Sequence, residues 1–233
     1  MKKIFIMFFI VTSLAMGDYL DTWDELLQEY TSIGKKDGIT LIVVDYRGLK
    51  QDIKFEKLLK EVSKVEIKKI KGDELKAFWI NAYNIGAIKM IVDNYPIDGI
   101  KDAGSLFKPV WSKDIIEIDG KIYSLGEIEN SVLRKSGDEL IHFAIVCASI
   151  SCPDLKRTAY REKDLERQLL DQKLKFLDEK NKGMDSVGNI IYLSKIFKWY
   201  KDDFGDIRKY LDISQDKKIK YFDYNWKLNE VKR

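Results

Sequence analysis

Residues 73–94 place the strongest constraint on the fold of this chain. Apolar side chains occupy nearly every side of a helix in this segment, from Leu75 to Val92. A helix that is apolar all round is stable only when other elements cover it. Two polar residues, Asn81 and Asn84, interrupt the apolar surface and share a face because they are three positions apart. Buried amides need hydrogen-bond partners, so the sequence predicts a central helix whose paired asparagines hold backbone or line a polar pocket.

The other segments predict helices and short strands around this helix. Helical apolar spacing occurs at residues 21–30, 55–62, 164–181 and 194–204, and strand-like runs occur at residues 38–46, 143–146 and 190–193. Asp119-Gly120 is a two-residue hairpin signal between residues 114–118 and 121–124. Ser124 and Glu127 match a capping box that opens a helix reaching about Lys135. Few parallel crossovers are evident, so we expect an α+β fold, a helix-rich single domain around a small, mainly antiparallel sheet.

The first 17 residues are typical of a secretory signal peptide. Lys2 and Lys3 precede a short apolar run, and the small residues Ala15 and Gly17 follow it. We expect cleavage after Ala15 or Gly17, which leaves residues 18–233 as one globular domain that is exported and either periplasmic or secreted. The alternative is an N-terminal anchor that is retained. No later stretch is long and apolar enough to suggest a membrane span, so no membrane contact is expected after cleavage.

Charge and composition exclude several classes of function. The whole chain has a net charge of +3, and the signal peptide carries two lysines and no acid, so the mature domain is nearly neutral. A concentrated positive face for nucleic acid is therefore not expected. No glycine-rich phosphate loop occurs in the sequence, and two cysteines are too few for a disulfide scaffold.

Residues 142–153 hold the only histidine of the chain, His142, and both cysteines, Cys147 and Cys152. A thiol becomes a nucleophile when a base or a positive neighbour favours the thiolate, so Cys147 with His142 is the candidate catalytic pair. One objection is geometric, because an odd separation along a strand points two side chains to opposite faces. The pair therefore requires the chain to leave the strand near Cys147. Without chemistry, Cys147 would be a buried core thiol.

Three other interpretations of this segment remain open. A disulfide between Cys147 and Cys152 is a candidate, because four intervening residues can loop to bring the sulfurs together and an exported setting permits it. A zinc or copper site has little support, since the spacing matches no standard pattern, and we predict neither a metal nor a cofactor. A serine nucleophile, Ser149 or Ser151, lacks the usual Gly-x-Ser-x-Gly elbow.

Five segments of the sequence together resemble the domain-of-unknown-function 547 (DUF547) family. They lie within residues 73–229 and comprise residues 78–84, 123–134, 142–153, 193–200 and 224–229. The resemblance implies that the paired asparagines and the His-x4-Cys segment are family signatures. It implies no established activity. Relatives often carry histidine after Ile-Glu, where this chain has Asn130, which argues against a mechanism with two histidines.

Two hypotheses follow, and they leave open whether the protein is an enzyme. In the first, it is a thiol-dependent hydrolase or transferase for a small peptide-like or thiol-containing molecule, with Cys147 and His142 catalytic. The residues expected to bind the substrate are Asn81, Tyr83, Asn84 and Ser149. In the second, it is a non-catalytic exported domain that binds a ligand or partner, with Cys147 and Cys152 structural or joined in a disulfide.

Overall fold

The computed structural model describes residues 15–105 and 107–231. The predicted signal peptide lies outside these residues except for its last three, which begin helix α1 (Ala15–Tyr30). None of the helices in the described ranges combines the length and the apolar content needed to cross a membrane.

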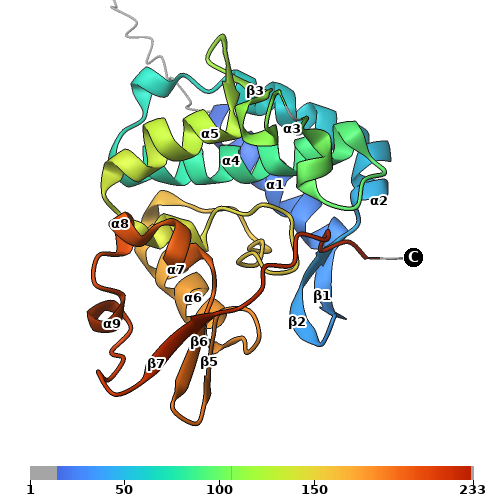
Figure 1. Cartoon of the computed structure of the whole chain (residues 1–233). Coiled ribbons are helices and arrows are strands. Elements are labelled where there is room, and N and C mark those ends of the chain that lie inside the picture. Colours follow the sequence, from blue (N-terminus) through green and yellow to red (C-terminus); the bar gives the residue numbers. More distant parts are fainter. Residues whose placement is uncertain (1–14, 106, 232–233) are drawn as a thin grey trace, which may run out of the picture.

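Helix α4 (Gly72–Asn94) is the buried centre of the fold, as the sequence predicts. Every residue from Ala77 to Ile88 is buried, including both asparagines. Figure 1 shows α4 among α1, α3 (Ile53–Ser63) and α5 (Leu125–Glu127) in the upper half of the molecule. The apolar surface of α4 is therefore covered by helices and loops on all sides, which is how such a helix is stabilised.

Across residues 15–105 and 107–231, three small sheets replace the single sheet that the sequence suggests. The hairpins β1 (Thr31–Lys36) with β2 (Ile39–Val44) and β3 (Asp114–Ile118) with β4 (Lys121–Ser124) are antiparallel. The third sheet joins β5 (Met184–Val187) antiparallel to β6 (Ile190–Leu193), and β7 (Lys218–Tyr221) pairs parallel to β6. The helix-rich α+β prediction is confirmed, and pairing is mainly antiparallel. The predicted turn is also confirmed, since Asp119 and Gly120 both have positive φ.

A second, smaller core lies in the lower half of Figure 1, where α6 (Leu165–Asp178) faces the third sheet. Three short helices complete this half: α7 (Ile196–Trp199), α8 (Lys201–Phe204) and α9 (Ile207–Tyr210). Another short helix, α2 (Tyr46–Gln51), belongs to the upper half. The core consists of buried aromatic and aliphatic side chains: Phe143, Phe176, Ile191, Leu193, Ile196, Phe197, Phe204 and Ile213. The single helix predicted over residues 194–204 is therefore two helices that meet at Tyr200.

The strand predicted at residues 143–146 is wrong. A 3-10 helix, Glu139–Phe143, runs into a turn in which Ala144 and Ile145 donate backbone hydrogen bonds to Ile141. The next backbone groups are bound by a side chain of α4 rather than by a neighbouring strand. The apolar run correctly indicated burial, but a short buried run does not by itself distinguish a strand from a helical turn.

Candidate functional site

A cavity of about 510 Å³ lies where the upper and lower halves meet. Its volume is in the range usual for sites that bind small molecules. Its walls include side chains from five parts of the chain: α4, the helical segment after β4, the His142–Pro153 segment, α7, and a tail that follows β7. The lining residues are Tyr83, Lys101, Trp111, Glu129, Asn130, His142, Ile145, Cys147, Cys152, Pro153, Ile196, Trp199, Tyr200, Tyr224 and Trp226.

Cys147 is half-buried at the wall of this cavity, immediately before a left-handed residue. Ala148 has φ +58° and is itself buried. An L-residue in this conformation costs about 1–2 kcal/mol, so surrounding contacts must hold it there. Asn229 donates its backbone N–H to Ala148 O at 3.0 Å, and Cys152 N donates to Ser149 O at 3.1 Å. The chain thus turns at Cys147, which is the geometry that a reactive thiol here requires.

Three polar side chains surround the sulfur of Cys147. Ser149 Oγ lies 3.0 Å from Sγ and Tyr224 Oη lies 3.3 Å from it. A hydrogen bond from the Cys152 thiol contributes most to lowering the pKa of Cys147 to about 7, and the bonds from Ser149 and Tyr224 add to it against the opposing effect of burial. Hydrogen-bond donors to a sulfur favour its charged form, so the Cys147 thiol ionises more readily near neutral pH than an ordinary cysteine.

Cys152 is buried beside Cys147, and both residues are free thiols in this structure. The backbone N–H of Cys147 donates to Cys152 Sγ at 2.9 Å. Burial and the neighbouring Cys147 sulfur raise the pKa of Cys152 well above its ordinary value. The two cysteines therefore differ in character: one is a half-exposed potential thiolate and the other a buried thiol.

His142 shares the cavity with Cys147 but bonds to a different partner. Its Nε2 lies 2.7 Å from Asp203 Oδ2, and its ring stacks on Tyr200 at 4.0 Å between centroids. Burial lowers the pKa of His142, although Asp203 acts in the opposite direction. Within the described ranges no hydrogen bond joins His142 to Cys147, so their catalytic pairing stays a prediction.

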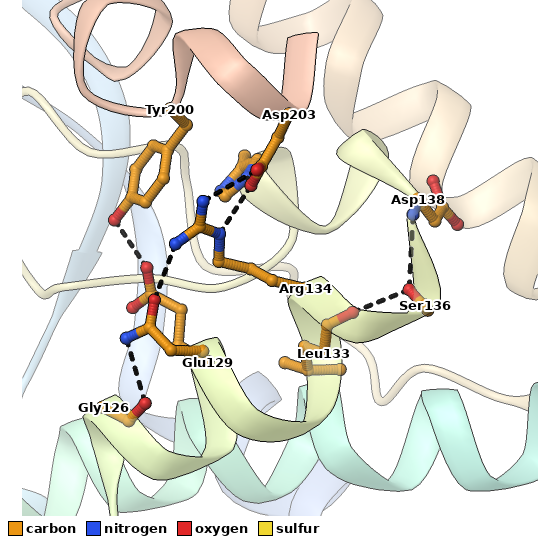
Figure 2. Close-up of polar contacts among 10 residues, drawn as sticks. Gly126, Glu129, Leu133, Arg134, Ser136, Asp138, Tyr200 and Asp203 are labelled. Atoms are coloured by element: carbon orange, nitrogen blue, oxygen red, sulfur yellow. Dashed lines mark hydrogen bonds and ion pairs between the residues drawn. The ribbon is translucent and has the colours of Figure 1, made fainter.

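A π-helix, Ile128–Leu133, contributes Glu129 and Asn130 to the polar wall of the cavity. Figure 2 shows Tyr200 and Asp203 reaching down from the α7–α8 region to Glu129 and Arg134. Tyr200 Oη donates to Glu129 Oε1 at 2.6 Å, while Arg134 binds both carboxylate oxygens of Asp203 at 2.6 and 2.7 Å. Such π-helical turns occur frequently at functional sites. This one carries the buried carboxylate of Glu129, and Arg134, which follows it, shares the Asp203 carboxylate with the imidazole of His142.

The paired asparagines lie behind the cavity and are not among its lining residues. Asn84 donates to Ala144 O at 2.9 Å and accepts from Val146 N at 2.9 Å. Asn81 makes the same two-bond clamp on Tyr160, donating to its O at 2.8 Å and accepting from its N at 2.9 Å. These amides therefore hold backbone, and Asn84 fixes the two peptide groups that lead into Cys147.

Tyr83, from the same helix α4, does line the cavity. Its hydroxyl donates to Glu129 Oε2 at 3.2 Å. Of the four residues predicted to bind substrate, Tyr83 borders the cavity and Ser149 touches the Cys147 sulfur, whereas the two asparagines act through the backbone.

The tail after β7 supplies the remaining aromatic wall. It pairs with the segment after Cys147, because Ile150 N donates to Lys227 O at 2.9 Å and Ser149 forms a bridge with Leu228. This pairing seats Tyr224 against the Cys147 sulfur. Trp226 packs against Trp111 and Trp199 and carries the ammonium of Lys101 3.6 Å above its ring.

Sequence reasoning missed several residues of this site: Glu129, Arg134, Tyr200, Asp203, Tyr224 and Trp226. Each lies far from His142 or Cys147 along the chain or has an unremarkable local sequence; Asp203, for example, is 61 residues from His142. The available signal was that residues 123–134, 193–200 and 224–229 belong to the segments on which the family resemblance rests. Among the described residues there is no group of three or more histidine, cysteine or acidic side chains arranged to hold a metal ion.

The fold and the site define a helix-rich α+β domain with a polarised thiol in a cavity of small-molecule size. Residues 67–177 match the model of the family described as "Protein of unknown function, DUF547". This segment contains α4, the β3–β4 hairpin, the π-helix and both cysteines, so the DUF547 resemblance is confirmed there. No curated protein matches the chain, and no solved structure matches it.

Proposed function

We propose that the protein is a thiol-dependent hydrolase or transferase that acts on a small molecule held in the cavity. Cys147 is the nucleophile. The observation that carries the proposal is the convergence of three hydrogen-bonding groups on Cys147 Sγ, namely the Cys152 thiol and the hydroxyls of Ser149 and Tyr224, and their bonds lower the pKa of this thiol to about 7. A thiolate available at neutral pH is the reactive form of cysteine, and this one borders a cavity.

The imidazole favours one class of substrate over others. Because burial lowers the pKa of His142, the ring is mainly neutral near pH 7 and is a weak acid for an amine leaving group. A thiol leaving group has an ordinary pKa near 8.5 and departs as a thiolate without being protonated. Acyl thioesters of small thiols therefore suit the site better than amides.

Both chemical steps balance with these groups. In the first, the Cys147 sulfur attacks the acyl carbon, a new carbon–sulfur bond forms, and the substrate thiolate leaves with the electron pair of its own carbon–sulfur bond. In the second, water attacks the acyl carbon, His142 accepts a proton from that water, and the Cys147 thiolate is released. The hydroxyls of Ser149 and Tyr224, which lie 3.0 and 3.3 Å from Cys147 Sγ, are the groups we assign to donate to the oxyanion that forms in each step. In a transferase, an acceptor alcohol or amine takes the place of water.

Export is part of the same proposal and is supported by the sequence of residues 1–17. A periplasmic or secreted protein would lose this segment on the way. Sequencing the N-terminus of the protein recovered from its producing cell tests this, with a start at residue 16 or 18 expected. An intact Met1 on recovered protein would contradict export by cleavage.

The activity is tested with p-nitrophenyl acetate, an activated acyl donor. We expect a burst of p-nitrophenolate of about one equivalent per chain and a Cys147 peptide heavier by one acetyl group. Cys147→Ala should abolish both signals while its circular dichroism spectrum stays that of the parent. Cys152→Ser is the matched control, because a hydroxyl still donates to Cys147 Sγ and acylation should persist. Equal activity in Cys147→Ala would refute the proposal.

A binding function without chemistry is the second candidate, and the aromatic wall favours it. Trp111, Trp199 and Trp226 lie around one cavity with Lys101 over one of the rings, an arrangement suited to a flat or anionic ligand. If this is the function, small ligands will change tryptophan fluorescence while Cys147 stays inert toward the ester.

A further inference from the structure

We propose that Cys147 and Cys152 form a dithiol that reduces small-molecule disulfides admitted to the cavity, with Cys147 attacking first and Cys152 completing the exchange. This activity goes beyond acyl transfer. It shares with that function only the reactivity of Cys147.

The two sulfurs are already adjacent in the reduced protein. Cys152 Sγ accepts a hydrogen bond from the backbone N–H of Cys147 at 2.9 Å, and that nitrogen is three covalent bonds from Cys147 Sγ. The loop between the cysteines is closed by the Cys152 N to Ser149 O bond and by the left-handed Ala148. Both cysteines line the cavity. One short loop therefore holds both thiols beside the same cavity, which is the placement that an internal disulfide needs.

The surroundings set the order of attack. Cys147 is half-buried, whereas Cys152 is only 5% exposed, so an incoming disulfide meets Cys147 first. The pKa of Cys147 is lowered to about 7, and that of Cys152 is raised, which keeps the second thiol protonated until the first has reacted. A low-pKa attacking thiol with a buried partner is the arrangement expected for thiol–disulfide exchange.

The exchange balances in two steps. Cys147 thiolate attacks one sulfur of the substrate disulfide, forms a mixed disulfide and releases the first substrate thiolate. Loss of the negative charge on Cys147 removes one of the two causes that raise the pKa of Cys152, while burial of this thiol continues to raise it. Cys152 then loses its proton to solvent and attacks Cys147 Sγ, which releases the second substrate thiolate. Two electrons pass from the dithiol to the substrate, and the protein is left with a Cys147–Cys152 disulfide.

The surrounding residues suit a small-molecule disulfide better than a protein one. The cavity of about 510 Å³ is walled by Ile145, Ile196 and the tryptophans, and this volume suits a molecule of drug-like size. The hydroxyls of Ser149 and Tyr224 stand beside the sulfur that exchanges. They are placed to hydrogen-bond the sulfur of the leaving thiolate.

The test is a single-turnover reaction of the reduced protein with oxidised glutathione, followed by intact mass and peptide mapping. The parent should lose two hydrogen atoms, release two molecules of glutathione per chain, and yield a linked Cys147–Cys152 peptide. Cys152→Ser should stop at the mixed disulfide, with one glutathionyl group on Cys147. Cys147→Ser should stay unmodified under native conditions.

Two results would overturn the dithiol. One is a parent protein that keeps glutathione on Cys147 as stably as Cys152→Ser does, and the other is a parent protein that does not react. The peptide map of the parent decides the matter even if a variant fails to fold. Acyl transfer is judged separately by the p-nitrophenyl acetate burst: a burst without internal disulfide formation rejects this inference alone, and disulfide formation without a burst rejects the hydrolase alone.

Discussion

Replacement of Tyr224 by phenylalanine should raise the pKa of Cys147 and slow its alkylation at neutral pH. The substitution removes one donor, the hydroxyl 3.3 Å from Cys147 Sγ, and keeps the ring that packs against Trp199 and Trp226. A hydrogen bond to a charged group is worth about 1.5–3 kcal/mol. Because Ser149 and Cys152 still donate, the lower end applies, and about 1.4 kcal/mol equals one pKa unit.

The expected pKa of Cys147 in Tyr224→Phe is therefore about 8, compared with about 7 in the parent. At pH 7 the thiolate fraction falls from about one half to about one tenth, so the alkylation rate should fall roughly five-fold. Above pH 9 the two proteins should react at similar rates, because both thiols are then ionised.

The measurement is the rate of iodoacetamide labelling of the Cys147 peptide from pH 5.5 to pH 10, followed by mass spectrometry. Tyr192→Phe is the matched control, because Tyr192 stacks on Phe222 in the third sheet and is not part of the cavity. Its profile should match the parent. An unchanged Cys147 pKa in Tyr224→Phe would show that the tail hydroxyl does not stabilise the thiolate and would refute the reasoning.

Three further predictions concern the groups around the cavity. Asn84→Ala removes both hydrogen bonds that a buried side chain makes to the backbone, and it should lower the free energy of unfolding by roughly 2–5 kcal/mol in denaturant titrations. Asn94→Ala, at the partly exposed end of the same helix, should lower the free energy of unfolding clearly less. Asp203→Asn should lower the pKa of His142 further, because the carboxylate raises it. The proton NMR titration of this single histidine reports the change, and Asp202→Asn should leave it unmoved. The free energy of unfolding should decrease as the pH falls through about 6.5, because the pKa of His142 is lowered in the folded protein and the unfolded chain therefore binds the proton first. A further decrease is expected near pH 4 from the lowered pKa of Asp203. A free energy of unfolding that is flat from pH 7 to pH 5 would contradict this.

Much of the fold is predictable because its strongest signals are local. The apolar girth of residues 73–94, the Asp119-Gly120 turn and the Ser124–Glu127 capping box each depend on residues within one turn or one helix. The strand expected at residues 143–146 fails for a physical reason. Its backbone groups are bound by Asn84, which lies 60 residues away from Ala144, and no local pattern encodes that contact.

The candidate site could be predicted from its rare residue types, but the side chains that contact those residues could not be predicted. Cys147 and His142 stand out because histidine and cysteine are so scarce in this chain. Their partners, Asp203 and Tyr224, are common residue types that reach the cavity only through packing of α8 and of the tail. The burial of Glu129 within a π-helical turn is likewise a product of tertiary contacts.

Docking of residues 224–229 against residues 148–151 also sets when the surroundings of the Cys147 sulfur are completed during synthesis of the chain. Tyr224 follows Cys147 by 77 residues, so a growing chain exposes the cysteine long before the tyrosine has been made. Until the tail docks, the sulfur lacks one of its three donors and Ala148 lacks its bond from Asn229. Until then we expect the Cys147 thiol to have an ordinary pKa and to be mostly protonated at neutral pH.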